Sequence, residues 1–284
     1  MSAPTVRRRR LGAELRRLRE AAGLRLDDVQ EHTGISAVKA SRVETARTGV
    51  KPGDLDTLLT LYGVAKDDTE KRGVLHALAR DGARRGWWQT YADTISPAYA
   101  DLISLESQAR NIRTWQSTLI PGLLQTAAYA RATIDAINMT TPPDRVNALV
   151  EVRIARQSVL TRPDPPELWA IIHEVALRPQ LADTRVMREQ LQRLLDVTDL
   201  PHVSMQVLPL DSSPHPGMAG PFNLLGFPES ADLDIAHVED LTNALYVEDT
   251  AEVSIYRAAF ERLRAAALPF DESTDLIAQL KEAL

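Results

Sequence analysis

The sequence contains no cysteine. This absence excludes disulfides, thiolate zinc sites and cysteine nucleophiles, and it fits a reducing cytoplasm. No run approaches 18 uninterrupted apolar residues, so we expect no membrane span. The arginine run near the start has no apolar segment behind it, unlike a signal peptide. Gly-x-Ser-x-Gly, His-Glu-x-x-His and glycine-rich phosphate loops are also missing, so we expect neither an enzyme nor a bound cofactor.

Acidic residues outnumber basic ones over the whole chain, which has 284 residues and a net charge of −6. The distribution of charge is uneven. Residues 1–52 hold twelve Lys and Arg against six Asp and Glu, and the remainder carries a net charge of −12. A basic segment on an acidic body is typical of a small nucleic-acid-binding domain joined to a second domain. The alternative is a solvated basic helix face.

The N-terminal region predicts a bundle of short helices separated by glycines. Leu11, Leu15 and Leu18 mark the apolar face of a first helix, and glycines 23, 34 and 63 are stop signals. Ser36 is a good N-cap for a third helix over residues 36–44. The pattern predicts two helices joined by a tight turn, followed by a helix from Pro52. The charged segment 67–86 predicts a linker helix.

Residues 11–63 resemble the XRE (Cro/CI) helix-turn-helix domain of actinobacterial, Streptomyces-type regulators. The matching residues are Leu11-Gly12, Leu15-Arg16-Arg17-Leu18-Arg19, Gly23-Leu24, Gly34, Ser36, Lys39, Ser41-Arg42-Val43-Glu44-Thr45 and Leu58-Leu59. The resemblance implies an all-α DNA-binding domain over residues 11–66, whose third helix enters a DNA major groove.

The same resemblance implies contacts with an operator in double-stranded DNA. The implied base contacts are Ser36, Ala37, Val38, Lys39 and Arg42. Arginine is suited to a bidentate contact with guanine. The implied phosphate contacts are Arg25, Thr45, Arg47 and Lys51, together with Arg7, Arg8, Arg9 and Arg10 of a basic arm over residues 1–10. Glu44 is expected to accept hydrogen bonds inside the domain.

Four positions depart from the family pattern. Leu26, Ala37 and Val38 stand where the family usually has polar residues, and Ala46 stands where it has glycine. Ala37 and Val38 can touch only thymine methyl groups. Base readout then rests on Ser36, Lys39 and Arg42, or DNA binding is weakened and the domain serves as a scaffold.

The rest of the chain predicts a mixed α/β domain with a small sheet covered by helices, so that the whole chain is α+β. Short apolar or alternating runs predict strands at 111–116, 168–173, 203–208, 222–227, 234–238 and 244–247. Amphipathic patterns predict helices at 98–106, 121–137, 142–160, 185–197, 252–267 and 275–284.

Residues 87–284 resemble a C-terminal domain of unknown function that follows an XRE helix-turn-helix in many streptomycete regulators. The segments that carry this resemblance are Trp87-Trp88, Leu105-Glu106, Ile120-Pro121-Gly122-Leu123-Leu124-Gln125-Thr126, Tyr129-Ala130, Arg153-Ile154-Ala155-Arg156-Gln157, Leu160-Thr161-Arg162, Gln206-Val207-Leu208-Pro209, His215-Pro216-Gly217, Gly220-Pro221-Phe222, Tyr246 and Glu248. The resemblance implies a transcriptional regulator, often with a small partner protein encoded nearby. We expect this domain to bind a ligand or partner and to dimerise.

Several residues of this domain are candidates for ligand or partner contact: Trp87, Trp88, Trp115, His215 and Phe222. The adjacent tryptophans indicate either core packing or an exposed binding surface. The proline-rich loop 212–220 indicates a partner contact or a rigid connection. His173, Glu174, Asp211, His215 and Glu239 are the polar residues from which a catalytic site would have to come, and they match no catalytic motif. The chain offers no convergent set of His173, His215 and His237 for a metal.

The sequence thus predicts a cytoplasmic, homodimeric transcriptional regulator, most simply a repressor, whose operator binding is modulated through the C-terminal domain by a small partner protein or ligand. The alternative is the interaction module of a toxin–antitoxin-like pair, in which DNA binding is autoregulatory or vestigial.

Overall fold

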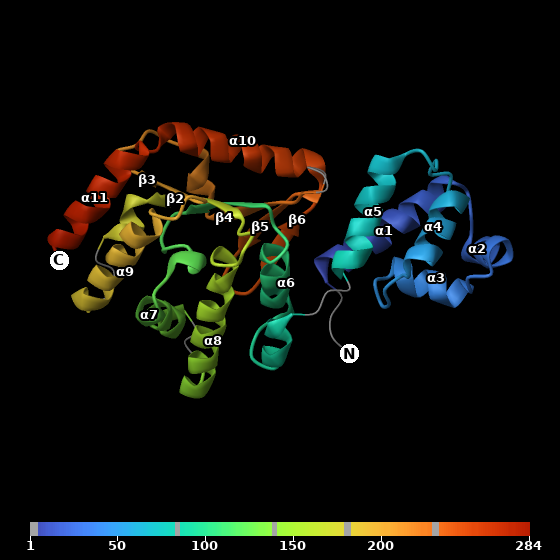
Figure 1. The fold of residues 1–284 in the computed structure, drawn as a ribbon, viewed down its shortest axis with the longest axis horizontal. Coiled ribbons are helices and arrows are strands. Elements are labelled where there is room, and N and C mark those ends of the chain that lie inside the picture. The colour runs from blue at the N-terminus through green and yellow to red at the C-terminus, as the bar shows by residue number, and fades with distance from the viewer. Residues whose placement is uncertain (1–4, 83–85, 138–140, 179–182, 229–232) are drawn as a thin grey trace. The chain divides into compact units, whose positions relative to one another are not determined.

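The computed structural model describes residues 5–82, 86–137, 141–178, 183–228 and 233–284. The chain divides into two compact units, Met1–Gly86 and Trp87–Leu284. The first unit is helical, and the second combines a six-stranded sheet with helices, which confirms the predicted α+β class (Figure 1). Among the described residues, no helix has the length and hydropathy that crossing a bilayer requires.

The first unit is a bundle of the helices α1 (Val6–Ala21), α2 (Leu26–Thr33), α3 (Ala37–Glu44), α4 (Pro52–Leu61) and α5 (Thr69–Gly82). Its core is built from leucines of α1 and α4 with Val29 and Val43. The predicted stop signals Gly23, Gly34 and Gly63 all adopt positive φ angles, of 72°, 72° and 82°. Glycine takes up this conformation without the steric cost of a Cβ atom, so each can end a helix.

Two predicted boundaries of this unit are wrong. The arginine run is not a separate arm, because Thr5 caps α1 through its side chain and residues 7–10 form the first turns of that helix. The predicted linker helix is instead α5, which packs against α1 inside the unit. Arg8 donates a hydrogen bond to the Gly82 carbonyl at 3.1 Å, and Arg7 is only 2% exposed. Arginine can bury its long aliphatic stem, so a run of arginines does not by itself indicate a solvated segment.

The second unit is organised around one mixed sheet with the strand order β3-β2-β1-β4-β5-β6. The strands are β1 (Asn111–Gln116), β2 (Glu167–His173), β3 (Val203–Leu208), β4 (Phe222–Gly226), β5 (Ile235–Glu239) and β6 (Ala244–Val247). The first three run parallel to one another, and β4, β5 and β6 are joined to the sheet by antiparallel pairing.

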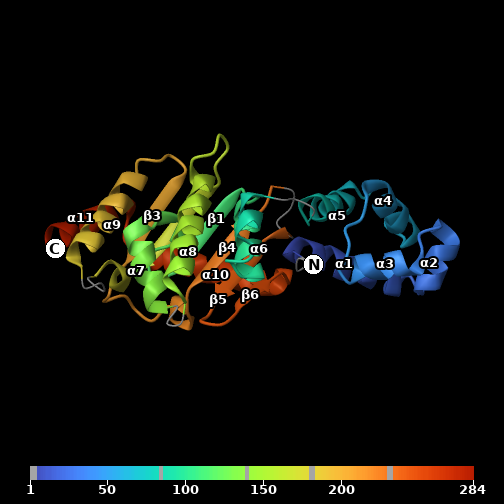
Figure 2. The ribbon, with the colours of Figure 1, turned by 90° about the horizontal axis from the view of Figure 1, so that it is seen from below.

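Helices cover both faces of this sheet (Figures 1 and 2). The helix α10 (Thr250–Ala266) lies on one face, where Phe260 and Leu263 pack with Trp115 and Phe222. The opposite face carries α6 (Pro97–Glu106), α7 (Ala127–Ile137) and α8 (Pro143–Arg156). The helices α9 (Thr184–Val197) and α11 (Phe270–Glu282) pack against each other beside β3.

Short 3-10 turns interrupt the helices predicted in this unit. The predicted helix 121–137 is the turn η2 (Gly122–Leu124) followed by α7, and the helix 142–160 is α8 followed by η3 (Gln157–Leu160). The turn η1 (Trp87–Tyr91) carries the tryptophan pair. The remaining turns are η4 (Glu174–Leu177) and η5 (Pro216–Ala219). The turn η2 brings its backbone to α8, where a polar pocket forms.

Candidate functional site

The second and third helices of the first unit form a rigid helix-turn-helix. Gly34 ends α2, and the buried Ile35 anchors the turn. Ser36 then caps α3, because its Oγ accepts a hydrogen bond from the Lys39 amide at 3.2 Å. Gln30 of α2 accepts a second hydrogen bond, from the Ala37 amide at 3.0 Å. Two free amides at the start of α3 are thereby satisfied, so the direction of the helix is fixed.

The inner face of α3 packs tightly on α1. Ala40 and Val43 are buried. A Cβ atom on Gly12 would lie 2.5 Å from the Glu44 carbonyl oxygen, so only glycine permits this approach of the two helices. Glu44 accepts two hydrogen bonds from Arg19, at 2.7 and 2.9 Å, in a largely buried ion pair. The structure therefore places Glu44 inside the domain, as the sequence predicts.

The outer face of α3 presents the proposed base-reading residues to solvent. Val38 is 62% exposed, and Arg42 is exposed and has no ion pair among the described residues. Ser36 is exposed and Ala37 is half-buried. Lys39 is exposed too, but its Nζ lies 2.6 Å from a carboxylate oxygen of Asp54 on α4. An exposed pair of this kind is worth about 0–1 kcal/mol, so a phosphate or a base acceptor can replace Asp54 at little cost.

The proposed phosphate contacts differ in their availability. Arg25, Arg47, Lys51 and Thr45 are exposed, and the Thr45 hydroxyl donates to the Ser41 carbonyl. Of the arginine run, Arg9 is exposed, Arg8 and Arg10 are half-buried, and Arg7 is buried. A phosphate contact by Arg7 does not fit this packing, because Arg7 is a buried residue of α1 and not part of a separate arm.

Two of the residues expected to contact a ligand or partner lie in the core instead. Trp115 is fully buried and donates its indole N–H to the Gly217 carbonyl at 3.0 Å. Phe222 is 5% exposed and packs against Tyr256. Both point to the α10 side of the sheet, where strand alternation puts large side chains into the core. Neither can contact a partner, so that expectation is wrong for both.

The other three candidates are half-buried. Trp87 and Trp88 meet edge to face, with ring centroids 6.2 Å apart, and pack against a cluster that includes Ile103 and Val152. His215 stacks edge to face on Trp115 at 5.5 Å. His173, at the end of β2, lies 6.2 Å from His215 between ring centroids. The described residues contain no group of three or more His, Asp or Glu side chains that could hold a metal ion.

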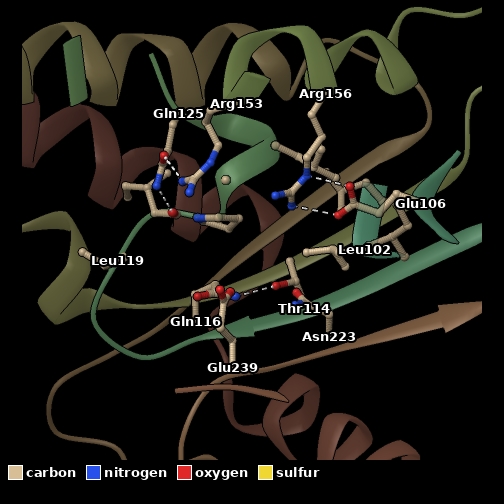
Figure 3. A pocket seen from close by; sticks show the side chains of 16 residues that line it. Leu102, Glu106, Thr114, Gln116, Leu119, Gln125, Arg153, Arg156, Asn223 and Glu239 are labelled. Carbon is tan, nitrogen blue, oxygen red and sulfur yellow. Dashed lines mark hydrogen bonds and ion pairs between the residues drawn. The ribbon is translucent and has the colours of Figure 1, made fainter. Parts of the chain in front are cut away.

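A polar pocket in the second unit was not predicted. It lies between the sheet face that carries Thr114 and Gln116 and the helices α6 and α8, with the turn η2 at its side (Figure 3). Its volume is about 120 Å³. We call it the arginine pocket, because Arg153 and Arg156 of α8 both line it. Its other polar lining residues are Glu106, Thr114, Gln116, Gln125, Asn223 and Glu239.

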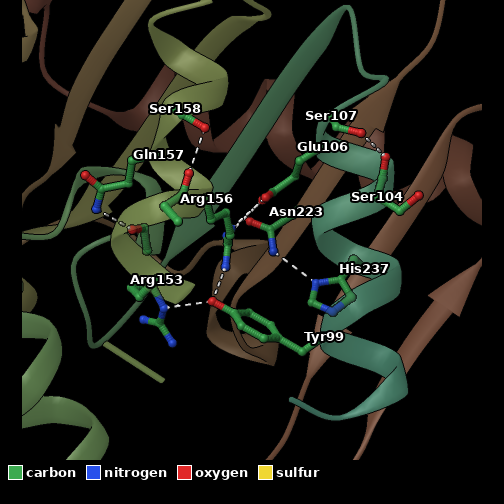
Figure 4. Close-up of polar contacts among 12 residues, drawn as sticks. Tyr99, Ser104, Glu106, Ser107, Arg153, Arg156, Gln157, Ser158, Asn223 and His237 are labelled. Atoms are coloured by element: carbon green, nitrogen blue, oxygen red, sulfur yellow. Dashed lines mark hydrogen bonds and ion pairs between the residues drawn. The ribbon is translucent and has the colours of Figure 1, made fainter. Parts of the chain in front are cut away.

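The two arginines of this pocket share one partner, Tyr99, and differ in the other (Figure 4). Arg156 forms a bidentate ion pair with Glu106, at 2.6 and 2.8 Å, and both side chains are largely buried. Arg153 donates from Nε to the Tyr99 hydroxyl at 3.1 Å and from Nη1 to the Gln125 side-chain oxygen at 2.7 Å. Arg156 also donates to the Tyr99 hydroxyl, at 3.2 Å. Burial alone would raise the pKa of Tyr99, but the charges of Arg156 and Arg153 outweigh it and lower that pKa.

Beside the pocket, a neutral histidine is held between strands. His237 of β5 is 2% exposed, and its Nδ1 lies 3.1 Å from the Asn223 amide nitrogen of β4. Burial, with a smaller contribution from the charge of Arg156, lowers the pKa of His237 to about 4. At neutral pH the ring is therefore uncharged and accepts a hydrogen bond from Asn223.

One signal for the pocket was present in the sequence. The buried positions Val146 and Val150 of α8 are followed at helical spacing by Arg153 and then Arg156. Arginines that continue an apolar stripe are placed against the core and need partners there. Ile154, between the two arginines, is 37% exposed and lies outside that stripe. The partners Tyr99 and Glu106 come from a distant segment and carried no signal of their own.

Comparison with known families divides the chain in the same way. A helix-turn-helix domain matches residues 10–71, and a domain of unknown function (DUF5753) matches residues 99–279. The second match covers more than half of the chain, which therefore belongs to the DUF5753 family. No curated protein and no solved structure matches it. Together the two domains indicate a DNA-binding regulator of the helix-turn-helix type.

Proposed function

We propose that this DUF5753 protein is a transcriptional regulator of the XRE type that recognises an operator with the outer face of α3. The observation that carries the proposal is the contrast between the two faces of that helix. The inner face is fixed by Gly12, Ala40 and Val43, and the outer face leaves Val38 and Arg42 exposed. A rigid helix with an exposed cation at its outer face meets the requirements for reading a major groove.

The side chains on this face suit different parts of the DNA. Arg42 can donate two hydrogen bonds to one guanine, and Val38 and Ala37 can contact thymine methyl groups. Lys39 binds a base or phosphate after it leaves Asp54. The exposed Arg25, Arg47 and Lys51 supply phosphate contacts, which add affinity without sequence preference. Few side chains therefore recognise bases, and sequence recognition depends mainly on Arg42.

The regulator acts as a homodimer in the cytoplasm, in this proposal, and represses transcription. Two-fold dimers bind half-sites one helical turn apart, which a single short recognition helix needs to reach useful affinity. The second unit, which contains the DUF5753 match and is called the DUF5753 unit, is a binding domain rather than an enzyme. A small protein partner or a ligand that prefers one dimer arrangement changes operator affinity by no more than its preference for that arrangement.

The test is a salt titration of binding to the DNA upstream of the protein's own gene and to a scrambled duplex. We expect tighter binding to the upstream DNA at every salt concentration. Arg42→Ala should weaken that binding by about 1–3 kcal/mol, or roughly 5- to 150-fold, while binding to scrambled DNA changes far less. Arg16→Ala, which removes an exposed arginine of α1 that pairs with Glu20, is the matched control. Equal affinity for both duplexes would contradict the proposal.

A second candidate function draws on the ion pair between Lys39 and Asp54. A carboxylate on the DNA-facing surface opposes phosphate, so the unit could serve as the interaction module of a toxin–antitoxin-like pair with vestigial DNA binding. Asp54→Asn separates the two functions. If Lys39 contacts DNA, this variant binds the upstream duplex more tightly than the wild type. An unchanged affinity, with co-purification of a stoichiometric small companion, favours the interaction module.

A further inference from the structure

We propose that the arginine pocket binds a small compound through a single carboxylate, which Arg153 holds. The two arginines of the pocket differ in their charged partners. The charge of Arg156 is balanced by its bidentate pair with Glu106. The hydrogen-bond acceptors of Arg153 are the Tyr99 hydroxyl and the Gln125 side-chain oxygen, and no carboxylate among the described residues forms an ion pair with it. A half-buried guanidinium that pairs with no described carboxylate attracts an anion from solution.

The guanidinium of Arg153 is held in a fixed orientation. Two hydrogen bonds fix the plane of the Arg153 guanidinium, and its acceptor Gln125 is held in turn. The side-chain amide of Gln125 donates to the Ile120 carbonyl at 2.8 Å, and the backbone carbonyl of Gln125 accepts from the Gln157 side chain at 2.7 Å. The Nη2 group of Arg153 has no hydrogen-bond partner among the described residues, so the end of the fork faces the pocket with donors to spare (Figure 3). A fixed guanidinium fork matches a carboxylate, and little conformational entropy is lost on binding.

The volume of the pocket and the charges that line it limit the size and the charge of the ligand. A volume of about 120 Å³ is several times the roughly 10–15 Å³ that one water requires, so the pocket has room for a ligand of a few heavy atoms. Glu106 and Glu239 also line the pocket, and Glu106 is the one of the two that pairs with Arg156. A dianion such as phosphate is repelled by both carboxylates, whereas a monoanion on Arg153 is not opposed to the same degree. Glu239 is exposed and has no ion pair among the described residues, so an ammonium group on the ligand would find a counter-charge there.

The backbone of η2 lies close to both arginines at Gly122. A Cβ atom on Gly122 would lie 3.3 Å from Arg153 Cδ and 3.5 Å from one nitrogen of each arginine. A glycine at this position lets the η2 backbone lie beside both guanidiniums without displacing them. The ligand site itself does not require DNA binding, whereas its use as an effector site rests on the proposed function.

The experiment is a binding titration of the full chain with ¹³C-labelled acetate, ¹³C-labelled glycine and inorganic phosphate, followed by NMR at pH 7 and constant ionic strength. We expect saturable binding of acetate at one site per chain, and weaker binding of phosphate. Arg153→Met should lower acetate affinity at least tenfold. Arg188→Met, which removes an exposed arginine from α9, should leave it unchanged. Tighter binding of phosphate than of acetate, or equal acetate affinity in Arg153→Met and the wild type, would overturn the proposal.

A second variant covers the possibility that Arg153→Met does not fold. Glu239 is exposed, so Glu239→Gln should keep the fold. Removing this negative charge should strengthen acetate binding two- to fivefold. If the ligand is an amino acid, the same variant should weaken glycine binding. Unchanged acetate affinity in Glu239→Gln would show that binding occurs elsewhere. None of these measurements includes DNA, so their failure is distinguishable from failure of operator binding.

Discussion

The two units handle their charged side chains in opposite ways. Each contains one buried, bidentate arginine–glutamate pair: Arg19 with Glu44 in the helix-turn-helix unit and Arg156 with Glu106 in the DUF5753 unit. Beyond that pair, the first unit keeps cations such as Arg42 exposed on a convex helix face. The second unit turns Arg153 into a pocket of about 120 Å³. The difference indicates a partner as large as DNA for the first unit and a few-atom ligand for the second.

The largest effect is expected from breaking the buried pair of the second unit. Glu106→Ala leaves Arg156 charged and buried without its carboxylate, which costs about 3–5 kcal/mol of the free energy of unfolding of that unit. All four tryptophans lie in the DUF5753 unit, so tryptophan fluorescence during urea unfolding reports this unit alone. Glu151→Ala, at an exposed position of α8, is the control and should change little. Equal unfolding midpoints for the two variants would contradict the assignment.

The next effect is a loss of stability in acid that is confined to the second unit. The folded pKa of His237 is about 4, below the value near 6.5 expected for an unfolded chain. Between these values the unfolded state binds a proton that the folded state does not, so the free energy of unfolding falls as pH falls from about 6.5 to about 4. At about 1.4 kcal/mol per pH unit, His237 accounts for a loss of about 3 kcal/mol.

His237→Gln tests this expectation, because glutamine keeps an acceptor for Asn223 but does not titrate. Urea unfolding followed by tryptophan fluorescence at pH 7 and pH 4.5 should show a smaller acid loss in the variant than in the wild type. Parallel losses in the two proteins would mean that His237 is not the group responsible.

A smaller effect is expected in the first unit, at the contact of α1 with α3. Gly12→Ala forces a Cβ atom against the backbone oxygens of Val43 and Glu44, at 2.7 and 2.5 Å, and should destabilise the unit by about 1–3 kcal/mol. Gly53→Ala, which meets nothing within 4 Å on α4, is the matched control. Far-UV circular dichroism should show earlier loss of helix only for Gly12→Ala, with the tryptophan-reported transition unmoved. A shift of both transitions would contradict the independence of the units.

The smallest effect concerns Ala46, a non-glycine residue with a positive φ angle. Ala46 has a φ angle of 59° and is 3% exposed. Ala46→Gly relieves left-handed strain of about 1 kcal/mol and loses the burial of one methyl group, worth about 0.8 kcal/mol. Thermal melts should therefore show a change of less than about 1 kcal/mol, whereas Ala46→Val should destabilise clearly. Strong destabilisation by Ala46→Gly would mean that the methyl group matters more than the strain.

Local patterns predicted much of the fold. Helix ends in the first unit followed from Gly23, Gly34 and the Ser36 cap, because these residues act on the backbone beside them. The strands 111–116, 203–208 and 244–247 were predicted with the bounds that the structure has. The prediction of a separate arm was wrong, because the charge of the arginine run indicated a solvated segment. Arg7 is instead buried, in a helix that packs against α5.

The arginine pocket could not be predicted in the same way. Arg153 and Arg156 come from α8, while Tyr99 and Glu106 come from α6, some 50 residues earlier. Only the tertiary fold brings these elements together over the sheet. Trp115 was predicted to contact a ligand or partner, and it lies in the core. An aromatic side chain in a strand can face either a ligand or the core, and here α10 covers it.

The most direct test of the central claim is genome-wide mapping of bound DNA for the wild type and for Arg42→Ala, repeated after deletion of the small gene that would encode the proposed partner. The proposed function predicts discrete sites with paired half-sites for the wild type, their loss in Arg42→Ala, and altered occupancy without the small gene. Binding spread over the genome without preferred sites, or an unchanged map for Arg42→Ala, would contradict the claim that the outer face of α3 reads DNA sequence.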